Sequence, residues 1–379
     1  LITSSAASDV YKRQGYHSDT DKDFRLIGTE KSMSKTKLKI ENLYKIFGPR
    51  GKSFIDPVKD GMSKQELLDN HSHVLGLNNI NLDIPEQRIQ VIMGLSGSGK
   101  STLIRHINRL IEPTAGAITV DDEDILSMSQ LQLREFRRKK TSMVFQKFAL
   151  LPHKTVAQNV AYGLTIQGEQ ESIAKEKSHK WIESVGLSGF EERYPAQLSG
   201  GMQQRVGLAR ALATDAPILL MDEAFSALDP LIRTDMQNIL LELQKDLHKT
   251  IIFITHDLDE ALRIGDNIAI LRDGKIIQKG DPQQIIMKPA DDYISDFIKD
   301  INRGKVIEVK SIMQKGSSKG TSLDSSCSLE DALKVLNNEK NNECSVIDDK
   351  GKKIGKVTLD AAIGALFREK ASRNKEKYK

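Results

Sequence analysis

The 379-residue chain has two cysteines and one tryptophan, and it has no apolar run long enough to cross a membrane. A membrane-spanning helix needs about 20 predominantly apolar residues, so we expect no span in this chain. Cys327 and Cys344 cannot build a disulfide framework, and we expect free thiols in the reducing environment of the cytoplasm. Residues 1–32 carry scattered charges and lack the apolar segment of a secretory signal.

The beginning of the chain has little regular pattern. Its first residue is Leu, and alternation of apolar and polar residues starts only after Met33. We therefore expect residues 1–32 to be disordered or a non-native leader, with the folded protein starting near Met33.

An excess of charge of one sign is also missing, because 56 basic and 52 acidic residues give a net charge of +4. So small an excess argues against a nucleic-acid partner. Residues 350–379 differ, since ten basic minus three acidic side chains give +7 there. Such a tail is usually a solvated end. The alternative is attraction to anionic lipid, which salt would screen.

What the sequence does contain is a phosphate-binding loop. Residues 94–101 read GLSGSGKS and fit the pattern G-x-x-x-x-G-K-[ST] at every fixed position. The apolar run Ile89 to Met93 predicts a strand before the loop, and Thr102 to Leu110 predicts a helix after it. Glycines let backbone N–H groups point at an anion, and the helix N-terminus adds positive charge. A plain glycine turn would not explain the Lys-Ser pair. The predicted ATP contacts are Gly94, Leu95, Ser96, Gly97, Ser98, Gly99, Lys100, Ser101 and Thr102.

Two of these side chains point to hydrolysis when they are combined with a second strand. Lys100 would reach the β- and γ-phosphates, and Ser101 would hold Mg²⁺. The apolar run at 217–221 predicts a buried strand that ends in Asp222 and Glu223. Asp222 is placed to hold Mg²⁺, and Glu223 to orient or deprotonate the attacking water. A lone strand ending in two acids would more often be a turn, so the phosphate loop decides the interpretation.

A second anion site is predicted at another helix start. Residues 198–202 read LSGGM, and apolar residues follow at helical spacing. Ser199, Gly200 and Gly201 would lie at the positive end of that helix. An ordinary capped helix start is the alternative interpretation.

The pattern of elements predicts an α/β core at residues 33–290. The strand-like runs, including one at 250–255, read as parallel strands with the nucleotide at their carboxyl ends. Helical spacing over about 130–200 predicts an inserted helical subdomain. A further insertion is predicted at 48–79, where Ser63 to Glu66 is a capping-box pattern that favours a short helix.

The order of these motifs resembles that of the ATP-binding cassette (ABC) ATPases over roughly residues 34–290. The motifs are the phosphate loop, VFQ ending at Gln146, LSGGM, ILLMDE, SALD ending at Asp229, and ITH ending at His256. LSGGM departs from the commonest family form, LSGGQ, in its fifth residue and keeps the serine and both glycines. The resemblance implies a P-loop ATPase that binds ATP and Mg²⁺.

The resemblance also implies roles for single residues. Gln146 would touch Mg²⁺ or water, His256 would contact the γ-phosphate, and Asp229 would communicate across a dimer. An aromatic that stacks on adenine is implied at the end of the first strand; Phe47 is our assignment and Tyr44 the competitor. The implied catalytic set is Lys100, Gln146, Glu223 and His256, and the implied metal ligands are Ser101, Gln146 and Asp222.

The family works as a dimer in which the LSGG segment of one subunit completes the phosphate site of the other. The resemblance therefore implies a homodimer that ATP closes and hydrolysis opens. It places the protein peripherally on the cytoplasmic face of the bacterial inner membrane. There it would drive separate integral-membrane permease subunits and, indirectly, work with a substrate-binding protein.

Within the cassettes, the chain is similar to the ATPase subunits of glycine betaine/proline betaine importers. The similarity rests on the 48–79 insertion, on NRLIEPT at 108–114, on EAFSALDPLIR at 223–233 and on a C-terminal unit. None of these would contact the solute, so the substrate rests on resemblance alone. One alternative is an amino-acid importer ATPase, which we expect to lack the long insertion. A non-transport cassette acting on nucleic acid or ribosomes is the less favoured alternative, since those typically carry two cassettes or long coiled coils.

The C-terminal unit at 305–379 follows a linker helix at 291–304 and resembles a single cystathionine-β-synthase-type (CBS) repeat. Its pattern predicts helix, strand, turn, strand and helix. Ligand-binding repeats commonly place Thr or Ser three residues before Asp; here Thr358 and Asp360 are closer, so we predict no ligand. We expect the repeat and the basic tail to report ionic strength through contact with anionic lipid.

Overall fold

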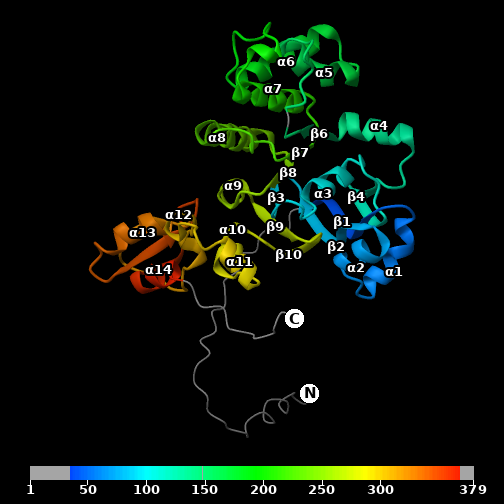
Figure 1. Cartoon of the computed structure of the whole chain (residues 1–379). Coiled ribbons are helices and arrows are strands. Elements are labelled where there is room, and N and C mark those ends of the chain that lie inside the picture. Colours follow the sequence, from blue (N-terminus) through cyan, green and yellow to red (C-terminus); the bar gives the residue numbers. More distant parts are fainter. Residues whose placement is uncertain (1–34, 147, 368–379) are drawn as a thin grey trace, which may run out of the picture. The chain divides into compact units, whose positions relative to one another are not determined.

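The structure is a computed structural model, and it describes residues 35–146 and 148–367 (Figure 1). The predicted leader at 1–32 and the end of the basic tail, from residue 368, lie outside these residues. The described strands form three sheets, of six, four and three strands. Across the described ranges, none of the helices combines the length and the apolar character that crossing a bilayer requires.

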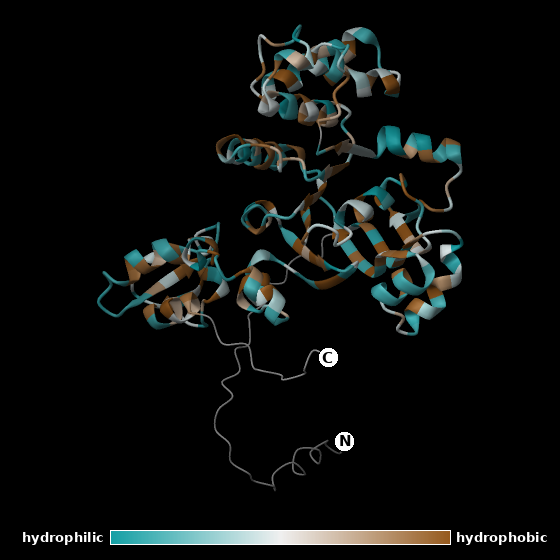
Figure 2. Cartoon of the chain, in the orientation of Figure 1, coloured by the Kyte–Doolittle hydropathy of each residue, from teal (hydrophilic) through white to brown (hydrophobic). Residues whose placement is uncertain are grey.

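The six-stranded sheet is the core of the α/β fold. Its order is β10-β9-β3-β8-β7-β6; β10 runs antiparallel to β9, and the other neighbours are parallel. Every residue of β3, β7 and β8 is buried, as expected for parallel strands covered on both faces. Figure 2 shows the hydrophobic colour gathered on these central strands. The three predicted strands are confirmed. The strands are β3 (Ile89–Met93), β6 (Thr141–Val144), β7 (Ile218–Asp222), β8 (Thr250–Thr255), β9 (Asn267–Arg272) and β10 (Lys275–Gly280).

A second, antiparallel sheet has the order β2-β1-β4-β5. Its strands are β1 (Thr36–Phe47), β2 (Val74–Pro85), β4 (Ala115–Val120) and β5 (Glu123–Asp124). The predicted insertion lies between β1 and β2, and it ends at residue 73 because Val74 already pairs with Phe47. The predicted capping box is confirmed: Glu66 N donates to Ser63 Oγ at 3.1 Å, and Ser63 N donates to Glu66 Oε2 at 2.8 Å. The insertion contains η1 (Gly51–Phe54), α1 (Ile55–Lys59) and α2 (Lys64–His71).

The helical subdomain has a hydrophobic cluster of its own, which includes Val160, Ile182 and Val206. The predicted range of about 130–200 is corrected at one point, because β6 is a strand of the core sheet and pairs with β7. At four residues, with two of them half-buried, β6 is too short for its periodicity to be recognised. The helices of this region are α4 (Gln130–Lys139), α5 (Val156–Gln167), α6 (Glu171–Ser184), η2 (Pro195–Gln197) and α7 (Gly200–Ala213).

The C-terminal unit has the predicted helix, strand, turn, strand and helix, preceded by a short strand that pairs in parallel with the next. Its elements are β11 (Ser322–Asp324), α13 (Leu329–Leu336), β12 (Glu343–Ile347), β13 (Lys353–Thr358) and α14 (Leu359–Leu366). Arg303 ties the unit to the preceding helices: its Nε donates to Ala365 O at 2.9 Å and its Nη1 to Ile286 O at 3.1 Å.

Of the remaining helices, α8 and α9 connect strands of the six-stranded sheet, α3 leads from that sheet to the four-stranded one, and the others precede the C-terminal unit. The single linker helix predicted at 291–304 is instead two short helices, because the chain turns at residues 298–302 between them. The helices are α3 (Lys100–Ile107), α8 (Pro230–Leu247), α9 (Leu258–Ile264), α10 (Pro282–Met287), α11 (Asp292–Phe297), α12 (Arg303–Val306) and η3 (Val309–Ser311).

Candidate functional site

The predicted phosphate loop connects the carboxyl end of β3 to the first turn of α3. Gly94, Gly97 and Gly99 have φ angles of 154°, 78° and 105°, a region that glycine adopts without a steric penalty. Gly99 is also the N-cap of α3, so the loop N–H groups and the positive helix end face the same space. This arrangement can cradle an anion.

Lys100 lies inside this loop with only 4% of its surface exposed. Its Nζ donates to Gly94 O at 2.8 Å and to Leu95 O at 3.1 Å, and it lies 3.6 Å from Glu223 Oε1. A buried ammonium group needs partners, and here backbone carbonyls and one carboxylate supply them. The two neutral carbonyls can be exchanged for phosphate oxygens, which hold a lysine more strongly.

Ser101 and Asp222 meet at the metal position that the sequence predicts. Ser101 Oγ donates to Asp222 Oδ1 at 2.8 Å, and Arg105 Nη2 lies 3.5 Å from Asp222 Oδ2. Two oxygen ligands this close, one of them a carboxylate, fit the preference of Mg²⁺ for oxygen. The residues present are therefore compatible with the ion.

Glu223 is the centre of the arrangement. Its backbone has a φ of 48°, and its N–H donates to Ile254 O at 3.1 Å, which fixes the residue beyond the end of the strand. Gln146 Nε2 donates to Glu223 Oε2 at 3.2 Å, and His256 Nδ1 lies 3.6 Å from Glu223 Oε1. With Lys100 as the third neighbour, all four side chains of the predicted catalytic set come together. A carboxylate held in place by these three neighbours can serve as a general base towards a water molecule beside it.

Ser199 caps α7, because its Oγ accepts a hydrogen bond from Met202 N at 3.3 Å. Ser199 and Gly200 are exposed, so the positive end of α7 is open to a ligand or a partner. Among the described residues, no hydrogen bond or ion pair joins Ser199, Gly200 or Gly201 to the phosphate loop. Within one chain the two predicted anion sites are thus separate.

The two candidates for the adenine platform differ in exposure. Tyr44 is buried in the cluster under the insertion and is 6% exposed, whereas Phe47 is 38% exposed. A Cβ placed on Gly76 would lie 2.6 Å from Phe47 Cε2, and one placed on Gly99 would lie 2.7 Å from Gly76 O. Gly76 therefore lies between the Phe47 ring and Gly99, the last glycine of the phosphate loop. Lys45 Nζ is 5.0 Å from the centre of its ring.

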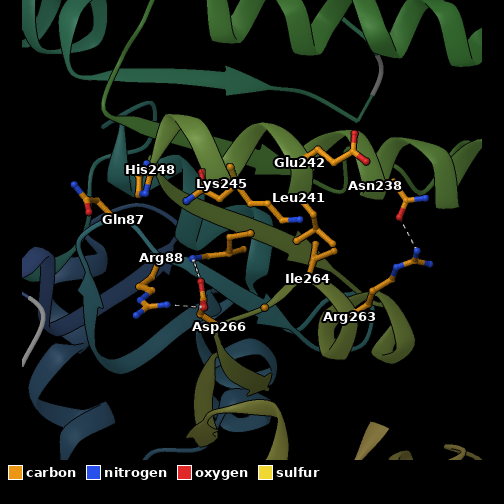
Figure 3. A pocket seen from close by; sticks show the side chains of 13 residues that line it. Gln87, Arg88, Asn238, Leu241, Glu242, Lys245, His248, Arg263, Ile264 and Asp266 are labelled. Atoms are coloured by element: carbon orange, nitrogen blue, oxygen red, sulfur yellow. Dashed lines mark hydrogen bonds and ion pairs between the residues drawn. The ribbon is translucent and has the colours of Figure 1, made fainter. Parts of the chain in front are cut away.

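Asp229 caps α8, where its Oδ1 accepts from Ile232 N at 3.1 Å. Like Ser199, it is exposed. A cavity of about 580 Å³ lies elsewhere, at the amino ends of β3 and β9, and contains none of the predicted ATP residues (Figure 3). Because the phosphate loop leaves the carboxyl end of β3, the two places lie at opposite ends of that strand.

Comparison with known proteins agrees with this geometry. The family model of ABC transporters matches residues 77–226. The chain is 46% identical, over 333 residues, to the glycine betaine/proline betaine transport system ATP-binding protein ProV of Escherichia coli. The match covers 88% of this chain and 83% of that protein. The chain belongs to the ATP-binding subunits of ABC transporters. The predicted family and its ATPase activity are confirmed.

Two further proteins are similar to this ABC ATPase, one in sequence and one in structure. The glycine betaine transport ATP-binding protein OpuAA of Bacillus subtilis is 54% identical over 279 residues, which cover 74% of this chain and 67% of that protein. The ATP-binding cassette MJ0796, solved as a dimer after hydrolysis with ADP and Pi, is 31% identical with a TM-score of 0.55. The match covers 65% of the ABC ATPase chain and 98% of that cassette.

Sequence reasoning missed two polar residues of the ABC ATPase site. Arg105 reaches Asp222, and Ser226 Oγ donates to Glu223 O at 2.9 Å and lies 3.4 Å from Gln146 Nε2. Arg105 had a signal, since it follows Ser101 by four residues and so lies on the same face of α3. Ser226 opens the SALD motif, but no pattern of residue types indicates its hydrogen bonds to a backbone oxygen and to the Gln146 amide.

Proposed function

We propose that this ABC ATPase energises the import of glycine betaine or proline betaine through separate permease subunits. The observation that carries the proposal is the identity with the E. coli protein, which extends over far more of the chain than the family model covers. The insertion between β1 and β2 favours this importer over an amino-acid importer, which we expect to lack it.

For hydrolysis we propose a homodimer in which Ser199 and the glycines of one chain complete the phosphate loop of the other. The open, exposed end of α7 supports this, as does the dimeric state of the related cassette. Lys100 would turn from Gly94 O to the β- and γ-phosphates as ATP enters. The dimer would sit peripherally on the cytoplasmic face of the bacterial inner membrane, with a substrate-binding protein as an indirect partner.

Each residue of the central cluster then has a proposed task. Ser101, Asp222 and Gln146 would hold Mg²⁺, which when bound neutralises charge on the phosphates. Glu223 would take the proton of the attacking water, and His256 would contact the γ-phosphate and keep Glu223 in place. Asp229, exposed before α8, would face the partner chain.

The substrate is testable in vesicles that contain the permease, the binding protein and the full chain. We expect ATP-dependent accumulation of radiolabelled glycine betaine, with proline betaine as a competitor and no accumulation with Glu223→Gln. Uptake of a labelled amino acid without betaine uptake would favour the alternative importer and contradict the proposal.

We also propose that the C-terminal unit is a CBS-like regulatory repeat that senses ionic strength at anionic lipid. Its support is a three-stranded sheet with two helices and the described lysines of its basic segment, Lys350, Lys352, Lys353 and Lys356. The same vesicles, prepared with and without anionic lipid, test it. Uptake should depend on salt only where anionic lipid is present; equal salt dependence in both would refute the role of the lipid.

The adenine platform gives a separate prediction. Phe47→Ala should raise the KM for ATP about tenfold with kcat nearly unchanged, because base–aromatic stacking is worth about 1–3 kcal/mol. Steady-state phosphate release measures both constants. Tyr44→Leu is the control: it removes the ring of the other candidate and should leave the KM within about twofold. A larger rise for Tyr44→Leu than for Phe47→Ala would reverse the assignment.

A further inference from the structure

The start of α8 joins two loops of the ATPase site through one side chain. Arg233 Nη2 donates to Ser226 O at 3.4 Å and to Leu228 O at 3.2 Å, both in the loop that ends at Asp229. Its Nη1 pairs with Asp257 Oδ2 at 3.1 Å, in the loop that contains His256. A single guanidinium group, partly buried with 28% of its side chain exposed, therefore spans both loops. Only a planar fork of several donors can make such contacts at once.

Asp257 is held as firmly on its own side. Its Oδ1 accepts from Glu260 N at 3.1 Å and so caps α9, and its N–H donates to Thr255 Oγ1 at 2.9 Å. Behind it, Gln237 Nε2 donates to Glu260 Oε1 at 3.0 Å, which links α8 to α9 again. Burial raises the pKa of Glu260. With Asp257 fixed at both backbone and side chain, the adjacent His256 has little freedom to move.

The restraint on Asp257 matters for His256 because much of the His256 side chain is exposed. The His256 side chain is 54% exposed, and its Nδ1 lies 3.6 Å from Glu223 Oε1. Packing therefore holds the ring weakly, and its position depends on the backbone of its loop. Glu223 in turn is bonded through its carbonyl to Ser226, whose own carbonyl receives Arg233. Arg233 thus contacts Asp257, next to His256, and Ser226, which is bonded to Glu223. Among the described residues, no hydrogen bond or ion pair joins it to His256 or Glu223 itself.

We propose that Arg233 is a positioning residue for ATP hydrolysis, which rests on the roles proposed above for Glu223 and His256, and that it acts by locking the loop at 226–229 and the loop at 256–257 into one geometry. Loss of the lock frees His256 and Glu223 from their mutual alignment while the phosphate loop stays as it is. The effect falls on the chemical step and spares nucleotide binding.

The test compares Arg233→Gln with a matched control in the full chain. Arg263 also joins α9 to α8, since its Nη2 donates to Asn238 Oδ1 at 2.8 Å, but it does so at the cavity far from the phosphate loop (Figure 3). We expect Arg233→Gln to lower kcat at least about tenfold with the Kd for ATP within about twofold, and Arg263→Gln to change neither. Arg233→Lys keeps the charge but not the fork, and should give an intermediate kcat.

A double-mutant cycle with Asp257→Asn separates positioning from general loss of structure. Asn caps a helix as well as Asp does, so this variant removes the ion pair and spares the α9 cap. Asp257→Asn should lower kcat as Arg233→Gln does, and the double variant should be little worse than either single one. The proposal is overturned if the losses of kcat in Arg233→Gln and Asp257→Asn are additive in the double variant. It is also overturned if Arg233→Gln and Arg263→Gln lose kcat and thermal stability equally, or if the kcat of Arg233→Gln stays within about twofold of wild type.

Discussion

Replacing Glu223 with Gln is expected to lower ATP turnover about 10²–10⁴-fold while ATP still binds, because an amide of the same shape cannot accept a proton from water. The size follows from the position of the carboxylate among Lys100, Gln146 and His256, all within 3.2–3.6 Å. Loss of negative charge should leave the cradle for ATP intact, since the phosphate loop is built from its own backbone.

The measurements are phosphate release under saturating ATP and the oligomeric state with and without ATP. If Glu223 is the base, the variant accumulates as a dimer in the presence of ATP, because the bridging phosphate is never removed. Glu242→Gln is the matched control; Glu242 is an exposed acid on α8 at the opposite end of the core sheet (Figure 3). Near-normal turnover of Glu223→Gln would mean that another group activates the water.

Most of the core fold could be predicted from the sequence because its central strands are mainly apolar runs of five or six residues. Ile89–Met93 and Thr250–Thr255 have no exposed residue, and such runs bounded by glycine or polar residues predict buried strands. β6 and β11 were not within reach, since strands of four and three residues carry too little periodicity. Their place depends on long-range pairing with β7 and β12.

The residues of the site also differ in whether the sequence could predict them. Motif residues could be named from the sequence, but the meeting of Ser101 with Asp222, 121 positions apart, needs the fold. Arg233 ends the run EAFSALDPLIR at 223–233, but its contacts in the site could not be predicted from that run. Its partners are two backbone oxygens and an aspartate in another loop, and no pattern of residue types encodes such a contact.

The glycines of the phosphate loop are expected to differ sharply in what a methyl group does to them. A Cβ on Gly94 would lie 2.2 Å from Leu271 O, in the neighbouring strand β9, whereas one on Gly97 would meet nothing within 4 Å. Both have positive φ, which costs an alanine roughly 1–2 kcal/mol. Gly94 adds a collision with backbone that no rotamer change relieves, typically worth about 1–3 kcal/mol more.

Gly94→Ala should therefore lower the apparent free energy of unfolding by about 3 kcal/mol, and Gly97→Ala by about 1 kcal/mol, as read from urea titrations of the full chain. Equal losses would show that the φ angle alone matters. The expected difference means that glycine is needed at these two positions for different physical reasons. At Gly97 only the φ angle opposes a side chain, but Gly94 is also required by the packing of β3 against β9. Part of a motif that is read as a nucleotide signature is thus fixed by the sheet that carries it.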